Sequence, residues 1–386
     1  MGKSIEEILK QMESERNQRI NEEQSKLDQI NNQRDISRKE WNKRMKMYEN
    51  LSNTSTAPGA GGGGSISTPT TPTILEYNIS QGSSFVWDGV TFTLDTSLPN
   101  YSYTATITSI PEQTTHLPGY ITLIGVTIGN SVTSIGNNAF EFCIQLTSIT
   151  IPDSVTSIGN SAFENCTSLT TITLPINSLF TSIGYKTFFG CSSLATITIP
   201  DSVTSIGVQA FADCTDLPSI TIPDSVTSID FGAFKGCSAS TSVTFGNSVT
   251  SIGNFAFNDC FSLTNVTIPA TVGSISESMF ANCTGLISVT ILSGVTNIDV
   301  SAFSGCVSLT SVTIPATIVS IGNFAFYNTA LTSIAIPNSV TSIGADTFTS
   351  SGLTTVYIAD GQLSKSSPSS GVDFFGVTVT TVLPTP

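Results

Sequence analysis

Beyond residue 121, hydrophobic and polar residues alternate in a pattern that returns at a nearly constant spacing. In one copy, LTSITIPDSVTSIGNSAFENC, Ile149 and Ile151 alternate with Ser148 and Thr150. This two-residue period is typical of a strand with one buried face. A proline ends the strand, and two further apolar residues follow before a glycine. We expect one such strand in each copy, with its Ser and Thr side chains facing outward.

The period of the pattern can be measured on a phenylalanine that recurs in every copy, mostly 23 residues apart. These are Phe140, Phe163, Phe188, Phe211, Phe234, Phe257, Phe280, Phe303, Phe326 and Phe348. A period of this length indicates a solenoid. One coil alone buries too little apolar surface to offset the entropy of ordering its residues, whereas stacked coils cover one another. We therefore predict a mainly β solenoid of about ten 23-residue coils over residues 121–360.

Local departures from the pattern predict local differences between coils. The segment from Ala162 to Cys166 predicts a short turn, helical or 3₁₀. The copy PINSLFTSIG carries two additional residues, which should make its coil bulge. Ser240 occupies a leucine position, and Thr329 and Ser351 stand at or near the cysteine position in the last two copies.

One cysteine in most copies raises the question of disulfides or a metal site. The eight cysteines are Cys143, Cys166, Cys191, Cys214, Cys237, Cys260, Cys283 and Cys306. Equivalent positions in stacked coils form a parallel column with about 4.8 Å per step, which leaves the Cβ atoms somewhat too far apart for a disulfide. We predict structural buried thiols, with disulfides as the alternative. Without CxxC pairs, the column offers no tetrahedral metal cluster.

Charge is sparse and unevenly distributed. Eleven of the fourteen Lys and Arg residues lie in the first fifty positions, and residues 51–386 carry three lysines against eighteen acidic residues. An acidic body of this kind is a poor ligand for phosphate backbones or anionic lipid, so we expect no nucleic-acid partner. No apolar run has the length of a signal peptide or a transmembrane segment, and we expect no membrane insertion.

The remaining segments differ from the repeats in composition. Residues 1–51 are rich in Glu, Lys, Gln and Arg and predict an α-helical coiled-coil or docking segment, the alternative being a solvated single helix or a partly disordered arm. Residues 52–73, rich in Gly, Ser, Thr and Pro, predict a flexible linker. Residues 74–120 contain strand-like alternation and are expected to form a β N-terminal cap, and residues 361–386 a C-terminal cap.

Catalytic motifs are missing from the sequence. The single histidine, His116, has no evident catalytic or metal-binding partners, and no HExxH, P-loop or GxSxG motif and no GxGxxG motif opening a helix occurs. We expect no enzyme activity and no cofactor. Asp153, Asp201 and Asp224 follow strand-ending prolines; a calcium site is conceivable there, but Pro-Asp is also an ordinary turn pair.

The outward-facing Ser and Thr residues of the strands form the most extensive candidate binding surface. Such an uncharged, hydroxyl-bearing face could accept a protein or a glycan, and it is similar in outline to the arrays of ice-binding solenoids. Thr also suits an exposed strand without any ligand. The candidate ligand-binding residues are Thr150, Thr173, Thr198, Thr221, Thr244, Thr267, Thr290 and Thr313.

The pattern LxxIxIPxxVxxIGxxAFxxC closely resembles the BspA-like, or Treponema pallidum type, leucine-rich repeat over residues 121–359. The segment FVWDGVTFTLD, with the YTATITSI that follows, resembles the strand cap of that family. The family is associated with adhesion and with binding host or matrix proteins. The resemblance therefore implies a non-enzymatic recognition surface for a protein or glycan on a cell surface.

The order of helical segment, linker and solenoid also resembles a virion fibre or decoration protein. This resemblance implies a homo-oligomer displayed on the virion surface and attached through residues 1–51. The alternatives are a cellular BspA-like surface adhesin, an intracellular leucine-rich-repeat scaffold in the cytoplasm, and a purely structural virion component.

Overall fold

The computed structural model describes residues 84–87, 90–95, 102–105, 109–110, 125–130, 132–358 and 378–380. All of them belong to the second of two compact units, Ile74–Pro386. The predicted helix at residues 1–51, the predicted linker, His116 and much of both predicted caps lie outside these ranges. None of the described residues forms a helix of the length and hydrophobicity needed to cross a lipid bilayer.

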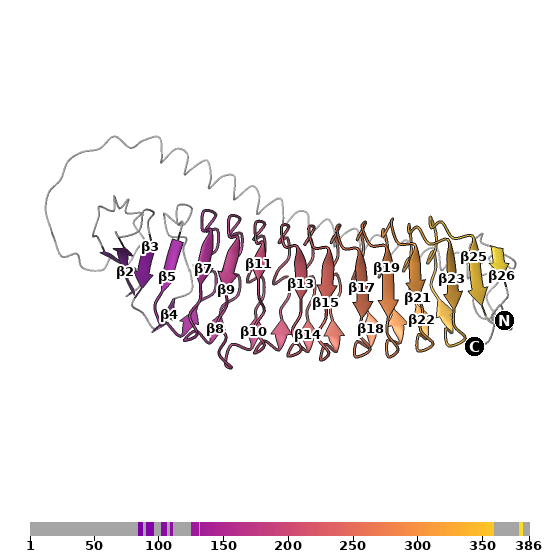
Figure 1. The fold of residues 1–386 in the computed structure, drawn as a ribbon, viewed down its shortest axis with the longest axis horizontal. Coiled ribbons are helices and arrows are strands. Elements are labelled where there is room, and N and C mark those ends of the chain that lie inside the picture. Colours follow the sequence, from indigo (N-terminus) through magenta and orange to yellow (C-terminus); the bar gives the residue numbers. More distant parts are fainter. Residues whose placement is uncertain are drawn as a thin grey trace, which may run out of the picture. The chain divides into compact units, whose positions relative to one another are not determined.

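Each coil contributes two strands, which lie in two separate rows (Figure 1). The first strands of the coils are β5 (Gly125–Ile128), β7 (Ser148–Thr150), β9 (Thr171–Thr173), β11 (Thr196–Ile197), β13 (Ser219–Thr221), β15 (Ser242–Thr244), β17 (Asn265–Ile268), β19 (Ser288–Ile291), β21 (Ser311–Thr313), β23 (Ser333–Ile336) and β25 (Thr355–Ile358). The second strands are β4 (Ser109–Ile110), β6 (Ser134–Ile135), β8 (Ser157–Ile158), β10 (Ser182–Ile183), β12 (Ser205–Ile206), β14 (Ser228–Ile229), β16 (Ser251–Ile252), β18 (Ser274–Ile275), β20 (Asn297–Ile298), β22 (Ser320–Ile321) and β24 (Ser342–Ile343).

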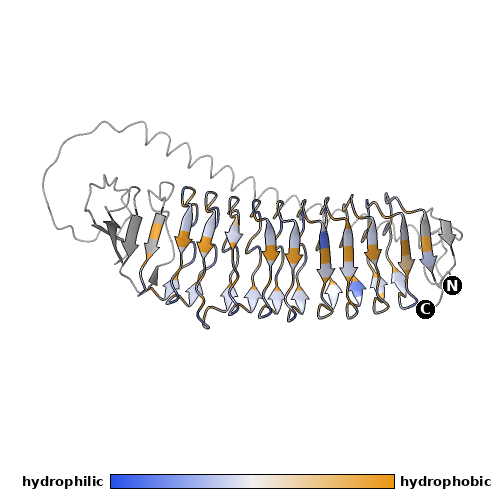
Figure 2. Ribbon diagram, in the orientation of Figure 1, coloured by the Kyte–Doolittle hydropathy of each residue, from blue (hydrophilic) through white to orange (hydrophobic). Residues whose placement is uncertain are grey.

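Within each sheet, successive coils pair in parallel and in register, and the sheets of the first row are separated between β11 and β13 and between β21 and β23. Ile149 of β7 lies opposite Ile172 of β9, and Ile158 of β8 lies opposite Ile135 of β6. Along the first strands, buried aliphatic residues alternate with exposed polar ones, as the sequence pattern predicts (Figure 2). The mainly β solenoid of about ten coils is therefore confirmed. The second row of strands was not anticipated.

The ends of the stack also carry strands. β1 (Ser84–Trp87) and β2 (Val90–Asp95) form an antiparallel hairpin at the predicted strand-like segment, and β3 (Ser102–Ala105) pairs with β2 and with β5. At the other end, β26 (Thr378–Thr380) pairs in parallel with β25. These strands extend the hydrogen bonding beyond the first and last coils, which reduces the exposure of unpaired strand edges.

The core contains a column of stacked phenylalanine rings. Rings of consecutive coils, from Phe140 to Phe348, lie with their centroids 5.1 to 5.7 Å apart and their planes within 20° of parallel. At this separation the rings are offset, an arrangement that aromatic pairs prefer. The rings are buried, and they pack with the aliphatic side chains of both strands into one continuous core. The solenoid interior is thus filled.

The segment before each cysteine is a series of turns, and the expectation of a helical or 3₁₀ turn is wrong. In the copy ending at Cys166, the N–H groups of residues 161, 163 and 165 donate to carbonyls of the next coil. The N–H groups of residues 162, 164 and 166 donate three residues back within the coil. A left-handed backbone at Ser161 (φ 55°) and Asn165 (φ 60°) produces this alternation, which a helix cannot provide.

The cysteines fill the inside of these turns. All eight are buried and none forms a disulfide. The Cys166 thiol donates to the Phe140 carbonyl oxygen of the preceding coil at 3.0 Å, and the same contact recurs along the column up to Cys306, which donates to Phe280 at 3.1 Å. At the equivalent position, the hydroxyl of Thr329 instead donates to Phe326 of its own coil at 3.1 Å. The cysteine therefore recurs because its small side chain fits the turn and joins adjacent coils.

Candidate recognition surface

The exposed side chains of the first strands form a continuous polar surface, which we call the hydroxyl face. The threonines proposed from sequence are all exposed in the structure: Thr150, Thr173, Thr198, Thr221, Thr244, Thr267, Thr290 and Thr313. Each lies on or next to a first strand. Its side chain points outward because successive side chains of a strand point to opposite faces and the neighbouring aliphatic residue points into the core. Within each sheet, parallel in-register pairing aligns the threonines of neighbouring coils, about 4.8 Å apart.

Some groups on the hydroxyl face contact one another across strands. The Thr196 hydroxyl donates to the Thr171 hydroxyl at 3.2 Å, and the Ser288 hydroxyl donates to Asn265 Oδ1 at 2.6 Å. From β7 to β21 the exposed positions of these strands are Ser, Thr and Asn, and no charged residue lies on them. Short hydroxyl and amide side chains both donate and accept hydrogen bonds, so the face suits a polar, uncharged part of a ligand.

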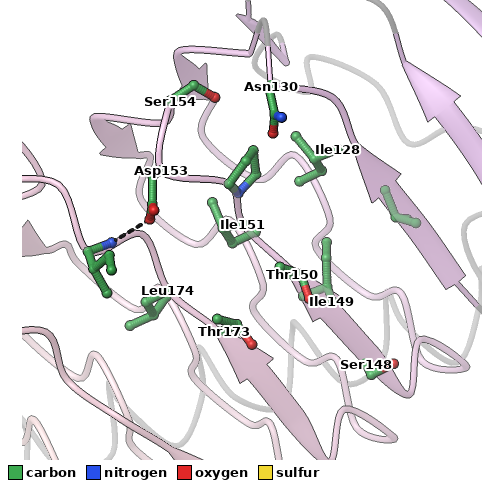
Figure 3. A pocket seen from close by; sticks show the side chains of 13 residues that line it. Ile128, Asn130, Ser148, Ile149, Thr150, Ile151, Asp153, Ser154, Thr173 and Leu174 are labelled. Carbon is green, nitrogen blue, oxygen red and sulfur yellow. Dashed lines mark hydrogen bonds between the residues drawn. The ribbon is translucent and has the colours of Figure 1, made fainter.

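A groove of about 740 Å³ lies at one end of the hydroxyl face and crosses β5, β7 and β9. Thr150 and Thr173 lie on neighbouring strands of its floor, and Asn130 and Asp153 lie where the strands turn (Figure 3). Ile176 forms part of its wall. The groove brings hydroxyl, carboxylate and exposed aliphatic groups together around one hollow.

The wall of the groove belongs to the two-residue insertion predicted from PINSLFTSIG, which forms an outward loop. Asn177 holds this loop: its Nδ2 donates to the carbonyl oxygens of Asp153 (2.9 Å) and Val155 (2.7 Å), and its Oδ1 accepts the N–H of Leu179 (2.8 Å). Ile176 is 75% exposed and Leu179 is 69% exposed, which makes them the most exposed of the large apolar residues in the described part of the chain. Sequence reasoning located the bulge but missed its apolar side chains.

The aspartates that follow the strand-ending prolines have structural roles. Asp153 Oδ1 accepts the N–H of Ile176 at 2.9 Å, and Asp224 Oδ1 accepts the N–H of Asn247 at 2.7 Å. The carboxylates of Asp153 and Asp224 thus join their corners to the next coil. Within the described ranges, no group of three or more His, Cys, Asp or Glu residues is arranged to hold a metal ion.

The cysteine thiols have the properties of core groups rather than of nucleophiles. Burial raises the pKa of Cys260 and of Cys306 to about 12, and it raises the pKa values of Cys166, Cys191, Cys214, Cys237 and Cys283 well above their ordinary value. The thiolate is the reactive form, so these cysteines are unreactive at neutral pH.

Positive charge within the coils lies away from the hydroxyl face. Residues 125–358 contain twelve acidic residues and two lysines, Lys186 and Lys235, both in the turns that precede a cysteine. Lys186 is engaged by Glu164, with 3.5 Å between Nζ and Oε1, and lies 4.6 Å from the ring centroid of Phe189. The hydroxyl face is therefore bordered by acidic groups and carries no cation.

A comparison with solved structures found similarity to several leucine-rich repeat proteins. A leucine-rich repeat protein from Eubacterium ventriosum is 23% identical, covering 72% of this chain and 95% of its own, with a TM-score of 0.41. A leucine-rich cell surface protein from Faecalibacterium prausnitzii is 27% identical, covering 76% of this chain and 100% of its own, with a TM-score of 0.31. The T. pallidum leucine-rich repeat protein is 26% identical, covering 57% of this chain and 87% of its own, with a TM-score of 0.34.

A search of curated proteins returned no match. The model of the BspA type leucine-rich repeat region, which comprises six copies, matches residues 108–238, 209–319 and 274–369. These overlapping matches cover well over half of the sequence and include every coil. The chain belongs to the BspA-type leucine-rich repeat family.

Proposed function

We propose that this protein is a non-enzymatic attachment protein, which uses the hydroxyl face to bind a protein or glycan on a cell surface. The observation that carries the proposal is the uninterrupted row of exposed Ser and Thr residues over a filled core. Because the interior is occupied, ligands can reach only the outer surface. Leucine-rich repeat solenoids of this family are typically binding scaffolds, which supports a recognition role.

The same proposal includes display in several copies on a virion, attached through residues 1–51. Multiple solenoids on one particle would raise the apparent affinity by a factor of about 10²–10⁴ without any new contact. A row of short polar side chains forms individually weak contacts, so such a surface benefits from multivalent display. A location on a cell surface or in the cytoplasm, and a purely structural virion role, are the competing outcomes.

Binding is tested with the labelled full chain on candidate host cells, comparing wild type with two charge-insertion variants. Thr221→Lys and Thr244→Lys place a long cation in the centre of the hydroxyl face. Thr227→Lys and Thr250→Lys make the same change at exposed threonines of the same coils, beside the second strands. We expect the first pair to lower cell binding at least tenfold and the second pair to leave it unchanged. Equal effects of both pairs, or no saturable binding by wild type, would refute the proposal.

Display is tested separately by mass spectrometry of purified virions and of host cell fractions. Enrichment of the protein in virions, together with competition of virion attachment by the purified full chain, supports the virion role. Enrichment in a cell envelope or cytoplasmic fraction assigns the protein to one of the cellular alternatives. Presence in virions without competition at saturating concentration indicates a structural component.

A further inference from the structure

The groove over β5, β7 and β9 combines three features that together define a ligand. It is hollow, it has an exposed aliphatic wall at Ile176, and it has a carboxylate at Asp153. Elsewhere the first strands offer a repeated, uncharged surface. A ligand bound in the groove would therefore contact hydroxyl, apolar and anionic groups at the same time.

The wall is held in place before any ligand binds. Three backbone N–H groups of the insertion loop, those of Ile176, Leu179 and Phe180, donate to the side chains of Asp153 and Asn177. A loop fixed in this way loses little conformational freedom on binding, so the contact of its aliphatic side chains with a partner contributes more fully to affinity. A concentration of exposed apolar surface of this kind is a feature of interaction sites.

The negative charge of the groove favours a ligand that carries positive charge. Asp153 is exposed, and a carboxylate can accept about four hydrogen bonds, so it can receive a ligand cation while Oδ1 still accepts the Ile176 N–H. The acidic groups Asp201 and Asp224 occupy the same corner in later coils, and the strands of the groove contain no Lys or Arg to compete. The site thus complements positive charge and disfavours anionic ligands.

Resting on the proposed function, we propose that the groove binds an extended basic segment of a partner protein. The segment lies across β5, β7 and β9, its backbone accepts and donates hydrogen bonds at Thr150 and Thr173, an aliphatic side chain packs against Ile176, and an adjacent Arg or Lys pairs with Asp153. Extended peptides are commonly recognised through hydrogen bonds to their backbone, combined with pockets for alternate side chains. This assigns the partner to proteins rather than glycans.

The test uses the full chain and three pools of ten-residue peptides that share their aliphatic positions but carry Arg, Gln or Glu at the variable polar positions. A glycan array is probed in parallel. We expect selective binding of the Arg pool, weakened by salt because the contact is partly electrostatic. Preference for the Gln or Glu pool, binding of glycans only, or no binding at all would overturn the inference.

Matched variants then test whether the peptide binds in the groove. Asp153→Asn keeps an acceptor for the Ile176 N–H and removes the charge, and Ile176→Ser removes the aliphatic wall. Each should weaken Arg-peptide binding about tenfold or more. Asp224→Asn and Ile287→Ser are the controls, since Asp224 makes the equivalent bond to the next coil and Ile287 is 49% exposed in a distant coil. Arg-peptide binding that is equally sensitive to the controls, or insensitive to the groove variants, refutes the site.

Cell binding measured with the same four variants separates this inference from the proposed function. If wild type binds cells and the groove variants bind equally well, the hydroxyl face acts elsewhere along the solenoid and the groove inference is wrong. If wild type binds no cells while the Arg pool binds the groove, the attachment role is wrong and the peptide site stands.

Discussion

Replacing Cys260 tests whether burial keeps the thiol column protonated. The side chain is fully buried, and its thiol donates to the Phe234 carbonyl oxygen at 3.4 Å. Desolvation by burial raises its pKa to about 12, against about 8.5 for a cysteine in an unfolded chain. Between these two values, the unfolded chain releases a proton that the folded chain keeps.

The direction of the pH effect follows from this difference. Because the folded pKa is raised, the contribution of the neutral thiol is fully present below about pH 8.5 and is lost as the pH rises toward 12, by about 1.36 kcal/mol per pH unit. From pH 8 to pH 10, the thiol of Cys260 should therefore lower the free energy of unfolding by about 2 kcal/mol. Cys260→Ala removes the titrating thiol. The lost packing lowers the free energy of unfolding by about 0.5–3 kcal/mol at every pH.

The stability deficit of Cys260→Ala relative to wild type should accordingly shrink by about 2 kcal/mol between pH 8 and pH 10. Urea unfolding of the full chain, followed by circular dichroism in a phosphine reductant, measures the deficit at each pH. Thr329→Ala serves as the control, since Thr329 is buried at the cysteine position of another coil and has no titrating group. Should the deficit of Cys260→Ala be the same at both pH values, the thiol is not held neutral by burial.

Two further substitutions test the packing of the coils. Phe257→Ala removes a buried ring that stacks on Phe234 and Phe280, both at 5.4 Å, and should lower the free energy of unfolding by about 3–5 kcal/mol. Phe348→Ala, which loses one stacked neighbour among the described residues, Phe326 at 5.7 Å, should cost less, and an equal cost in urea unfolding would argue against a role for the stack. Gly305→Ala puts a Cβ 2.5 Å from Asn282 Oδ1 at a φ of +75° and should cost at least about 1–2 kcal/mol, whereas Ser304→Ala should be neutral in the same thermal or urea assay; equal stability of the two variants would contradict the need for glycine.

The repeat period and the first strands were predictable because both depend on local alternation. Ile149 and Ile151 enter the core and Thr150 stays outside, as the two-residue period requires. The second strand was missed because it contains two residues, Ser157 and Ile158, which is too short to display any period. Its existence depends on hydrogen bonds to neighbouring coils, which are contacts 23 residues away.

The turns before the cysteines were misassigned for a related reason. Ala-Phe pairs suit a helix locally. In the structure, however, every second N–H of the segment donates to a carbonyl oxygen of the next coil, and residues with a left-handed backbone make this arrangement possible. A signal was present in the sequence: Asn165, Gly190, Asp213 and Gly236 each precede a cysteine, and these residue types tolerate a positive φ. The exposed apolar wall of the groove gave no comparable signal, because the bonds that turn Ile176 outward come from Asp153 in the coil before.

The periodicity that stabilises the solenoid also limits where specificity can reside. A partner that contacts only the repeated hydroxyl columns would find nearly the same contacts after sliding by one coil, about 4.8 Å, so such a face alone fixes affinity but not register. Discrimination requires a feature that occurs once. The insertion at residues 175–179 interrupts the period, lengthening the Phe163–Phe188 spacing to 25 residues and placing Ile176 beside the groove. A ligand anchored there, as we propose, would have one register on the remaining coils, and the insertion would then supply the specificity that the repeated face lacks.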